Sequence, residues 1–92
     1  MYQVKILERL EKEFRKMDRQ TIRIIKNWIV KNLVDTEDPR KKGKALSGNL
    51  NGIWRYRIGD YRLFAKIEDE ILTVFLFDIG HRREGERNDE VL

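Results

Sequence analysis

The chain has no cysteine, one histidine and one proline among its 92 residues. The absence of cysteine excludes a disulfide framework and any thiolate chemistry. A single histidine without cysteine also argues against a structural zinc site. We therefore expect neither a metal nor any other cofactor.

Long apolar runs are missing as well. No run reaches the roughly 20 residues that a membrane-spanning helix needs. Residues 1–14 carry too many charges for a signal peptide, so we expect a cytosolic protein without a membrane partner. A chain of this length makes a single domain, residues 1–92.

Charge is abundant and unevenly placed. About two fifths of the residues are charged and about two fifths apolar, and the apolar ones fall into periodic segments, as in a globular chain. Residues 39–66 hold eight cations and only one carboxylate, Asp60, a local balance of +7. This segment suits a polyanion, most simply nucleic acid. A solvated basic surface without a partner explains the composition equally well. The eight cations are Arg40, Lys41, Lys42, Lys44, Arg55, Arg57, Arg62 and Lys66.

The first half of the chain is patterned for one strand and two helices. Residues 2–6 alternate in polarity, which predicts a short strand. A first amphipathic helix follows, with apolar side chains at Leu7, Leu10, Phe14 and Met17. Asp18 is the predicted N-cap of a second helix, which ends before Pro39. Its apolar stripe is Ile22, Ile25, Ile29 and Leu33.

The second half predicts a basic loop and three strands. Residues 40–52 are polar and contain glycine, which indicates a loop, with a helical turn around residues 41–46. The first two strands, beginning at Trp54 and Tyr61, are joined by a two-residue turn, Gly59-Asp60. Residues 71–79 are apolar on both faces, as in a central strand.

These elements predict an α+β fold of order β-α-α-β-β-β, with a helical hairpin on one face of a small antiparallel sheet. The helices would cover the face that bears Trp54, Tyr56, Tyr61 and Leu63. Strand alternation then places four cations together on the open face: Arg55, Arg57, Arg62 and Lys66. Arginines gathered on one face repel one another, and an anionic ligand would offset that repulsion.

Such a face can do chemistry on RNA. Attack of a ribose 2′-hydroxyl on the adjacent phosphate builds negative charge, which preorganised guanidinium groups stabilise. Arginine is a poor general base because its pKa lies far above neutrality. His81 is the side chain whose ordinary pKa lies near neutrality. A lone histidine at a strand end is, however, more often a solvated or capping residue.

Three segments resemble RelE/ParE-superfamily toxins in their order and spacing. They are residues 44–48 (KALSG), 54–63 (WRYRIGDYRL) and 79–84 (IGHRRE). The resemblance implies a RelE-like fold across the chain. In the RelE branch it implies a toxin that enters the ribosomal A site and cuts mRNA without a metal, by 2′-hydroxyl attack that gives a cyclic phosphate.

The resemblance also implies roles for single residues. Arg55 and Arg57 would hold the flanking phosphates, while Arg62 and Arg82 would stabilise the transition state and the leaving group. Family members often carry a catalytic tyrosine a few residues after the last arginine, but residues 84–88 read EGERN. His81 could replace it as general base. The basic side chains expected to dock on RNA and ribosome are Lys41, Lys42, Lys44 and Lys66.

The expected partners are a RelB-like antitoxin, the ribosome with its mRNA, and operator DNA bound through the antitoxin complex. Two alternatives stay open. The ParE branch shares the fold but inhibits DNA gyrase by contact and cuts nothing. A catalytically weak relative would bind only antitoxin and DNA. The arginine set favours the nuclease.

Overall fold

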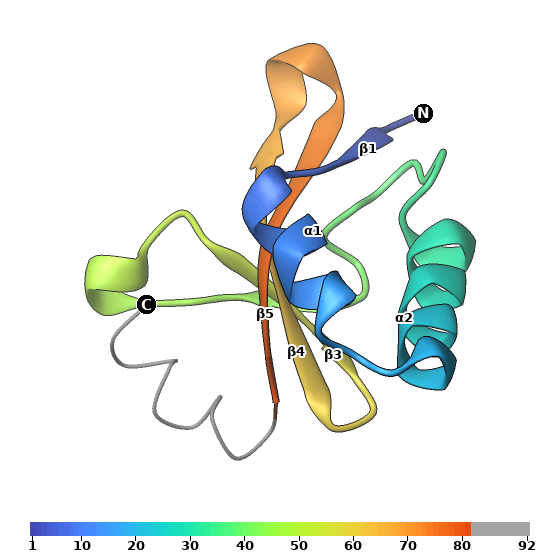
Figure 1. The fold of residues 1–92 in the computed structure, drawn as a ribbon. Coiled ribbons are helices and arrows are strands. Elements are labelled where there is room, and N and C mark those ends of the chain that lie inside the picture. Colours follow the sequence, from blue (N-terminus) through green and yellow to red (C-terminus); the bar gives the residue numbers. More distant parts are fainter. Residues whose placement is uncertain (82–92) are drawn as a thin grey trace.

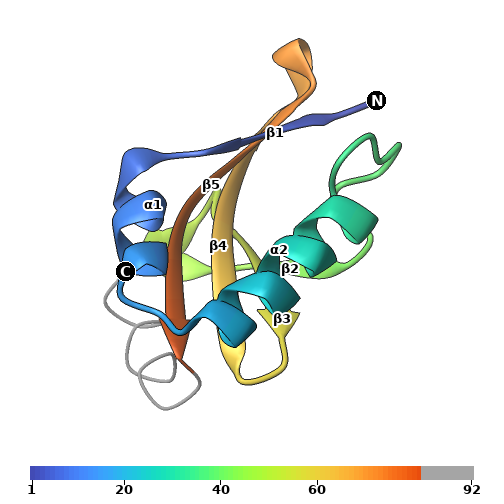
Figure 2. The same ribbon diagram turned by 45° about the vertical axis from the view of Figure 1, so that its right-hand side comes forward.

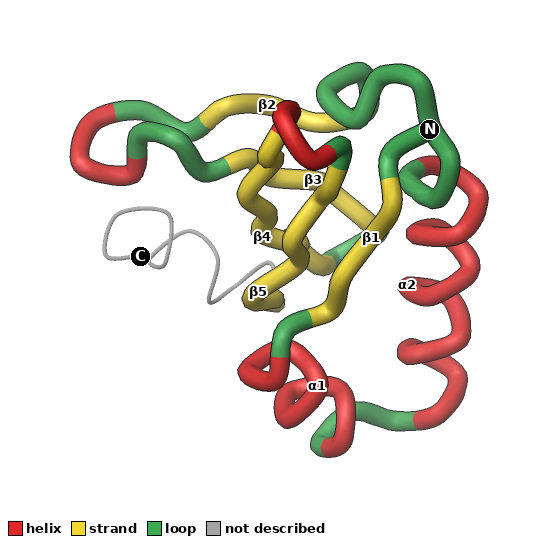
Figure 3. Tube along the Cα trace, turned by 90° about the horizontal axis from the view of Figure 1, so that it is seen from above, coloured by secondary structure: helices red, strands yellow, loops and turns green. Residues whose placement is uncertain are grey.

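Two helices lie on one side of a five-stranded sheet in the computed structural model, which describes residues 1–81 (Figure 1). Figure 3 shows both helices on the same side of the strands, with the loop of the short 3-10 turn η1 on the other. A second such turn, η2, precedes the last strand. The elements are β1 (Gln3–Ile6), α1 (Glu8–Arg15), α2 (Arg19–Asn32), β2 (Gly43–Ala45), η1 (Gly48–Leu50), β3 (Trp54–Ile58), β4 (Tyr61–Glu68), η2 (Asp69–Ile71) and β5 (Thr73–His81).

The strand order in the sheet is β1-β5-β4-β3-β2. The predicted α+β class and the succession of helices and main strands are confirmed. The sheet is mixed rather than purely antiparallel, because β1 pairs in parallel with β5 while the other neighbours are antiparallel. The two helices connect β1 to the rest of the sheet, and this crossover allows the parallel pairing.

The predicted helical turn at residues 41–46 is wrong, because part of that segment forms β2. It pairs antiparallel with β3, and Lys44 lies opposite Arg55. Three residues with a lysine make a short, charged edge strand, a common way of discouraging further pairing. The pairing partner supplies the hydrogen bonds that override the local pattern.

Helix α2 begins as predicted. The Asp18 carboxylate accepts a hydrogen bond from the backbone N–H of Thr21 at 3.0 Å and another from its hydroxyl at 2.7 Å. These bonds hold the pKa of Asp18 below its ordinary value. The predicted apolar stripe also faces inward, since Ile25, Ile29 and Leu33 are buried.

The hydrophobic core is formed by side chains from both helices and from one face of the sheet. Figure 2 shows the ribbons of the helices and strands that enclose it. Leu10 and Phe14 from α1 meet Leu63 of β4 and Leu76 of β5 there. The predicted hairpin between β3 and β4 is confirmed, and Gly59 in its turn has a φ of 59°, which glycine adopts at low cost. Because Tyr56, Leu63 and Ala65 enter the core, the cations that alternate with them on β3 and β4 face away from the helices.

No helix within residues 1–81 is both long enough and apolar enough to span a bilayer.

Candidate nucleic-acid interface

A row of cations crosses three neighbouring strands on the face opposite the helices. Tyr56 is fully buried in the core, so its neighbours Arg55 and Arg57 project to the other side of β3. Arg57 lies directly opposite Arg62 of β4, and Arg55 lies opposite Lys44 of β2. Side chains at such paired positions have Cβ atoms about 5 Å apart. We call these four side chains the cation row. The shared face of Arg55, Arg57 and Arg62 is as predicted, whereas Lys44 was predicted to lie in a loop.

Arg62 differs from the other members of the row because it is buried, with 7% of its surface exposed. Its partner on β5 is Gly80, which contributes no side chain beside the guanidinium. Phe64, two residues along the same face, is 1% exposed. Within residues 1–81 no helix covers this face, yet the face is not uniformly open. A charge in such a site acts more strongly on a nearby anion than a charge in bulk water.

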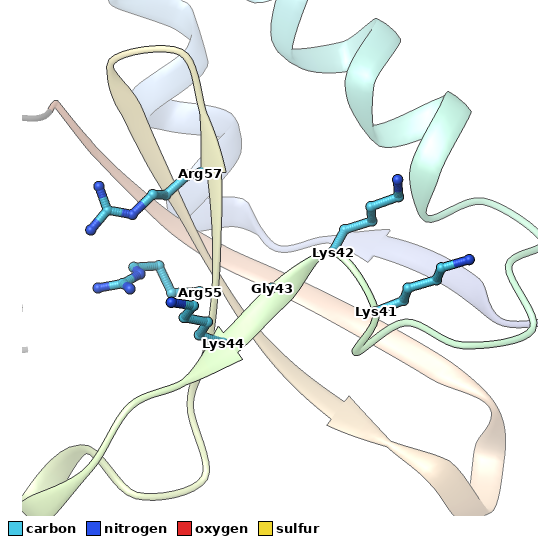
Figure 4. Close-up of a pocket in the computed structure, with 6 residues that line it drawn as sticks. All are labelled: Lys41, Lys42, Gly43, Lys44, Arg55 and Arg57. Atoms are coloured by element: carbon cyan, nitrogen blue, oxygen red, sulfur yellow. The ribbon is translucent and has the colours of Figure 1, made fainter.

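A hollow of about 290 Å³ lies beside the row. The side chains that residues 1–81 contribute to its lining carry only positive charge, and we call it the basic pocket. Figure 4 shows Arg55, Arg57 and Lys44 extending to one side of it, and Lys41 and Lys42 extending to the other. The pocket therefore offers two groups of cations rather than one. Its lining residues are Lys41, Lys42, Gly43, Lys44, Arg55 and Arg57.

Gly43 lets the wall of the basic pocket pack closely. A Cβ atom at this position would meet the Trp54 indole ring and would lie 2.7 Å from the backbone oxygen of Arg55. Both neighbours are rigid, so neither can give way cheaply.

We expect Gly43→Ala to lower the free energy of unfolding by about 1–3 kcal/mol, because an overpacked contact forces the backbone to shift. Chemical denaturation followed by tryptophan fluorescence measures the loss. Gly48→Ala is the matched control for a clash, since its Cβ would meet nothing within 4 Å, although its φ of 70° adds a smaller strain. Equal stability of Gly43→Ala and the native protein would contradict the close packing.

Lys66 stands apart from the basic pocket. It pairs with Phe75 of β5 and lines a separate hollow of about 480 Å³ together with Phe75 and Phe77. Apolar side chains line that hollow together with Lys66 and Glu68. Strand alternation thus places Lys66 on the predicted face but not within the arginine group.

His81 is placed at the other face of the sheet from the arginines. It lies opposite Tyr61 at the end of β5, and the two rings meet edge to face with centroids 5.1 Å apart. Tyr61 packs against the core, whereas its neighbour Arg62 belongs to the cation row. This placement counts against His81 as a proton acceptor beside the row. Arg82, the remaining predicted catalytic residue, lies outside the described residues.

Arg40 was grouped with the basic patch from sequence, yet the structure pairs it with a carboxylate. Its guanidinium donates two hydrogen bonds of 3.0 Å to Asp69, and Asp69 also accepts one of 2.6 Å from the Tyr2 hydroxyl. Hydrogen bonding to Arg40 and Tyr2 lowers the pKa of Asp69. The same carboxylate raises the pKa of the Tyr2 phenol. No sequence signal indicated this pairing, because Arg40 and Asp69 are 29 positions apart.

Tyr56 was predicted as core, and the structure adds a polar contact. Its hydroxyl donates to the carbonyl oxygen of Pro39, and both residues are fully buried. Burial raises the pKa of Tyr56 far above its ordinary value, so the phenol stays protonated as a donor. This bond ties β3 to Pro39, which lies just before Lys41, Lys42 and Lys44.

Residues 1–81 contain no group of three or more histidine, cysteine, aspartate or glutamate side chains arranged to hold a metal ion.

Comparison with known proteins gives consistent matches. Residues 4–85 match the family described as "ParE toxin of type II toxin-antitoxin system, parDE". The toxin RelG of Mycobacterium tuberculosis is 37% identical over 49 residues, which are 53% of this chain and 56% of that protein. The chain thus spans little more than half the length of that relative.

Two solved structures extend the likeness to the whole fold. One chain of the toxin–antitoxin complex RelBE2 from M. tuberculosis matches with a TM-score of 0.80 and 27% identity, over 88% of this chain and 98% of that one. The intact RelBE toxin–antitoxin complex of E. coli matches with a TM-score of 0.70 and 26% identity, over 88% and 96%. The sheet and both helices are therefore shared with these structures.

Proposed function

We propose that this chain, a member of the ParE toxin family of type II toxin–antitoxin systems within the RelE/ParE superfamily, is an endoribonuclease that cuts mRNA on the ribosome and so inhibits translation. The observation that carries the proposal is the cation row beside a pocket to whose lining residues 1–81 contribute no carboxylate. An RNA backbone supplies the negative charge that such a surface needs. The cytoplasm, where ribosomes are, would be its place of action.

The proposed reaction needs no metal. The ribose 2′-oxygen attacks the adjacent phosphorus, the bond to the 5′-oxygen of the next nucleotide breaks, and a 2′,3′-cyclic phosphate forms. Arg62, buried in the row, stabilises the charge that grows on the phosphate oxygens. Arg55 and Arg57 hold the flanking phosphates, and Arg82 would act on the leaving oxygen. These arginines stabilise charge, and none of them accepts the 2′ proton.

A second candidate function is inhibition of DNA gyrase by contact, without cleavage. It is favoured by the description of the matched family, which names the parDE system. The cation row would then meet a protein or DNA surface rather than a scissile phosphate. The two functions differ in the cellular process that stops first.

A direct experiment separates them. The purified chain is added to a cell-free translation reaction, and primer extension maps the 5′ ends of the mRNA, with and without ribosomes. We expect new ends within the codon at the ribosomal A site, only when ribosomes are present. Intact mRNA, together with inhibition of gyrase supercoiling in a parallel assay, would select the second function.

We further propose that a small acidic antitoxin of the RelB type neutralises this chain, and that operator DNA is bound through their complex. The two structural matches described above are toxin–antitoxin complexes. The net charge of +4 favours fast, salt-sensitive association with an acidic segment. Co-expression with the product of the neighbouring gene tests this, by size exclusion and a melting scan, and a bound partner should raise the melting temperature by mass action. A neighbour that neither co-purifies nor suppresses toxicity would remove this part of the proposal.

The lysines of the basic pocket should contribute mainly to affinity. We expect the triple replacement of Lys41, Lys42 and Lys44 by glutamine to weaken ribosome association. Its salt slope should fall by up to about 2, since each cation on a single strand accounts for about 0.7 of the slope. Binding titrations between low and moderate salt measure this, and an unchanged slope would show that the lysines are merely solvated. Cleavage in the bound complex should change little.

A further inference from the structure

Arg40 lies at the centre of a contact network at one end of the sheet. Its guanidinium makes two parallel hydrogen bonds to Asp69 in the η2 turn and lies 5.9 Å from the ring centroid of Trp54. The Tyr2 hydroxyl completes the network through Asp69. We call Tyr2, Arg40 and Asp69 the Arg40 latch. In a bidentate arginine–carboxylate pair, two parallel hydrogen bonds fix the orientation of the guanidinium as well as its distance from the carboxylate. Most single ion pairs on a protein surface do not fix the orientation.

The latch closes directly beside the lysine segment, residues 41–44. Arg40 immediately precedes Lys41, and the carbonyl oxygen of Arg40 accepts a hydrogen bond from the backbone N–H of Gly43. Pro39, which precedes Arg40, is buried, and its carbonyl oxygen accepts a hydrogen bond from the Tyr56 hydroxyl. The two residues before the lysines are thus anchored from η2 and from β3.

Such anchoring of the backbone lowers the entropic cost at which the lysine side chains bind a phosphate. Each has a long flexible stem, so binding a phosphate costs conformational freedom, and a mobile backbone would add to that cost. A segment whose backbone is already in place loses less on binding. The latch uses a carboxylate for this purpose without placing it in the basic pocket, to whose lining the described part of the chain contributes neither Asp69 nor any other acid.

We propose that Arg40 and Asp69 are positioning residues, whose latch holds residues 41–44 in the geometry in which Lys41, Lys42 and Lys44 bind the phosphates of single-stranded RNA. The proposal rests on the function proposed above and extends it to residues that touch no RNA. It predicts that removing a negative charge at position 69 weakens RNA binding, although the net charge of the protein becomes more positive.

The test compares two variants of the full chain that change net charge equally. Asp69→Asn opens the latch, whereas Glu70→Gln removes a carboxylate from the same η2 turn without touching Arg40. The first readout is the rate of tryptic cleavage after Arg40, Lys41, Lys42 and Lys44, which reports on the lysine segment whether or not RNA binds. The second is the dissociation constant for a synthetic single-stranded oligoribonucleotide, titrated at several salt concentrations.

We expect Asp69→Asn to speed tryptic cleavage and to weaken RNA binding about threefold to tenfold, the cost of ordering a released segment. Glu70→Gln should leave cleavage unchanged and binding equal or slightly tighter. Asp69→Glu should restore most of the binding, because it returns the carboxylate. Arg40→Lys keeps the charge but not the two-pronged contact and should resemble Asp69→Asn. Melting curves confirm that each variant is folded at the assay temperature.

Each remaining outcome has a definite meaning. If Asp69→Asn and Glu70→Gln behave alike in both readouts, the latch does not position the lysines. Faster cleavage with unchanged RNA binding would reduce the latch to a structural contact and overturn the proposal. If the native protein itself fails to bind the oligoribonucleotide, the proposed role of the lysines in binding single-stranded RNA is overturned, whereas ribosome-dependent cleavage is judged by the primer-extension experiment.

Discussion

Replacing Arg62 with alanine is expected to lower the rate of mRNA cleavage by about 10²–10³-fold. Arg62 is the buried member of the cation row, so its charge meets a transition state that water screens poorly. Losing one preorganised electrostatic contact typically costs an enzyme a factor of this size. Single-turnover cleavage in the cell-free translation reaction measures the change.

Two further variants make this result specific. Arg62→Lys retains the charge but lacks the planar fork, and we expect an intermediate rate. Arg23→Ala removes one charge from the exposed surface of α2, across the core from the row, and should leave cleavage near the native rate. Because Arg62 is buried, the melting temperature of each variant must be compared first. Native-like cleavage by a folded Arg62→Ala protein would overturn the catalytic role.

The largest expected loss of stability follows Leu76→Ala in β5. Leu76 is fully buried and contributes to the core between the helices and the sheet. Truncating such a side chain removes its transfer free energy and leaves a cavity, at a cost of about 2–5 kcal/mol. Small domains have only about 5–15 kcal/mol in total, so much of the stability should disappear. Urea unfolding followed by circular dichroism measures it.

Ile24→Ala provides the comparison for Leu76→Ala. Ile24 lies on α2 with 56% of its surface exposed, so its truncation should change the free energy of unfolding by no more than about 0.5 kcal/mol. Similar losses in the two variants would show that the core does not lie where the structure places it.

Periodicity and turn chemistry by themselves determined most of the fold. The spacing of Ile25, Ile29 and Leu33 marks the buried side of α2, and Asp18 marks its start. Alternation along β3 and β4 separates the core side chains from the arginines, whatever the strands pair with. These features are local, because a helix repeats every 3.6 residues and a strand every two.

Tertiary pairing decided what local pattern could not. Residues 43–45 have no strong strand pattern, and they extend the sheet only because β3 supplies their hydrogen bonds. The parallel pairing of β1 with β5 likewise joins residues about 70 positions apart. A sequence pattern identifies a strand but not its neighbour, so the mixed sheet could be learned only from the structure.

The candidate site divides in the same way. Alternation was enough to place Arg55, Arg57 and Arg62 on one face, because side-chain direction within a strand is a local property. Only the three-dimensional structure showed that Arg40 is paired with Asp69 and that the His81 ring lies against Tyr61. Contacts of this kind depend on which distant segments pack together, and the sequence of either segment alone does not predict its partner.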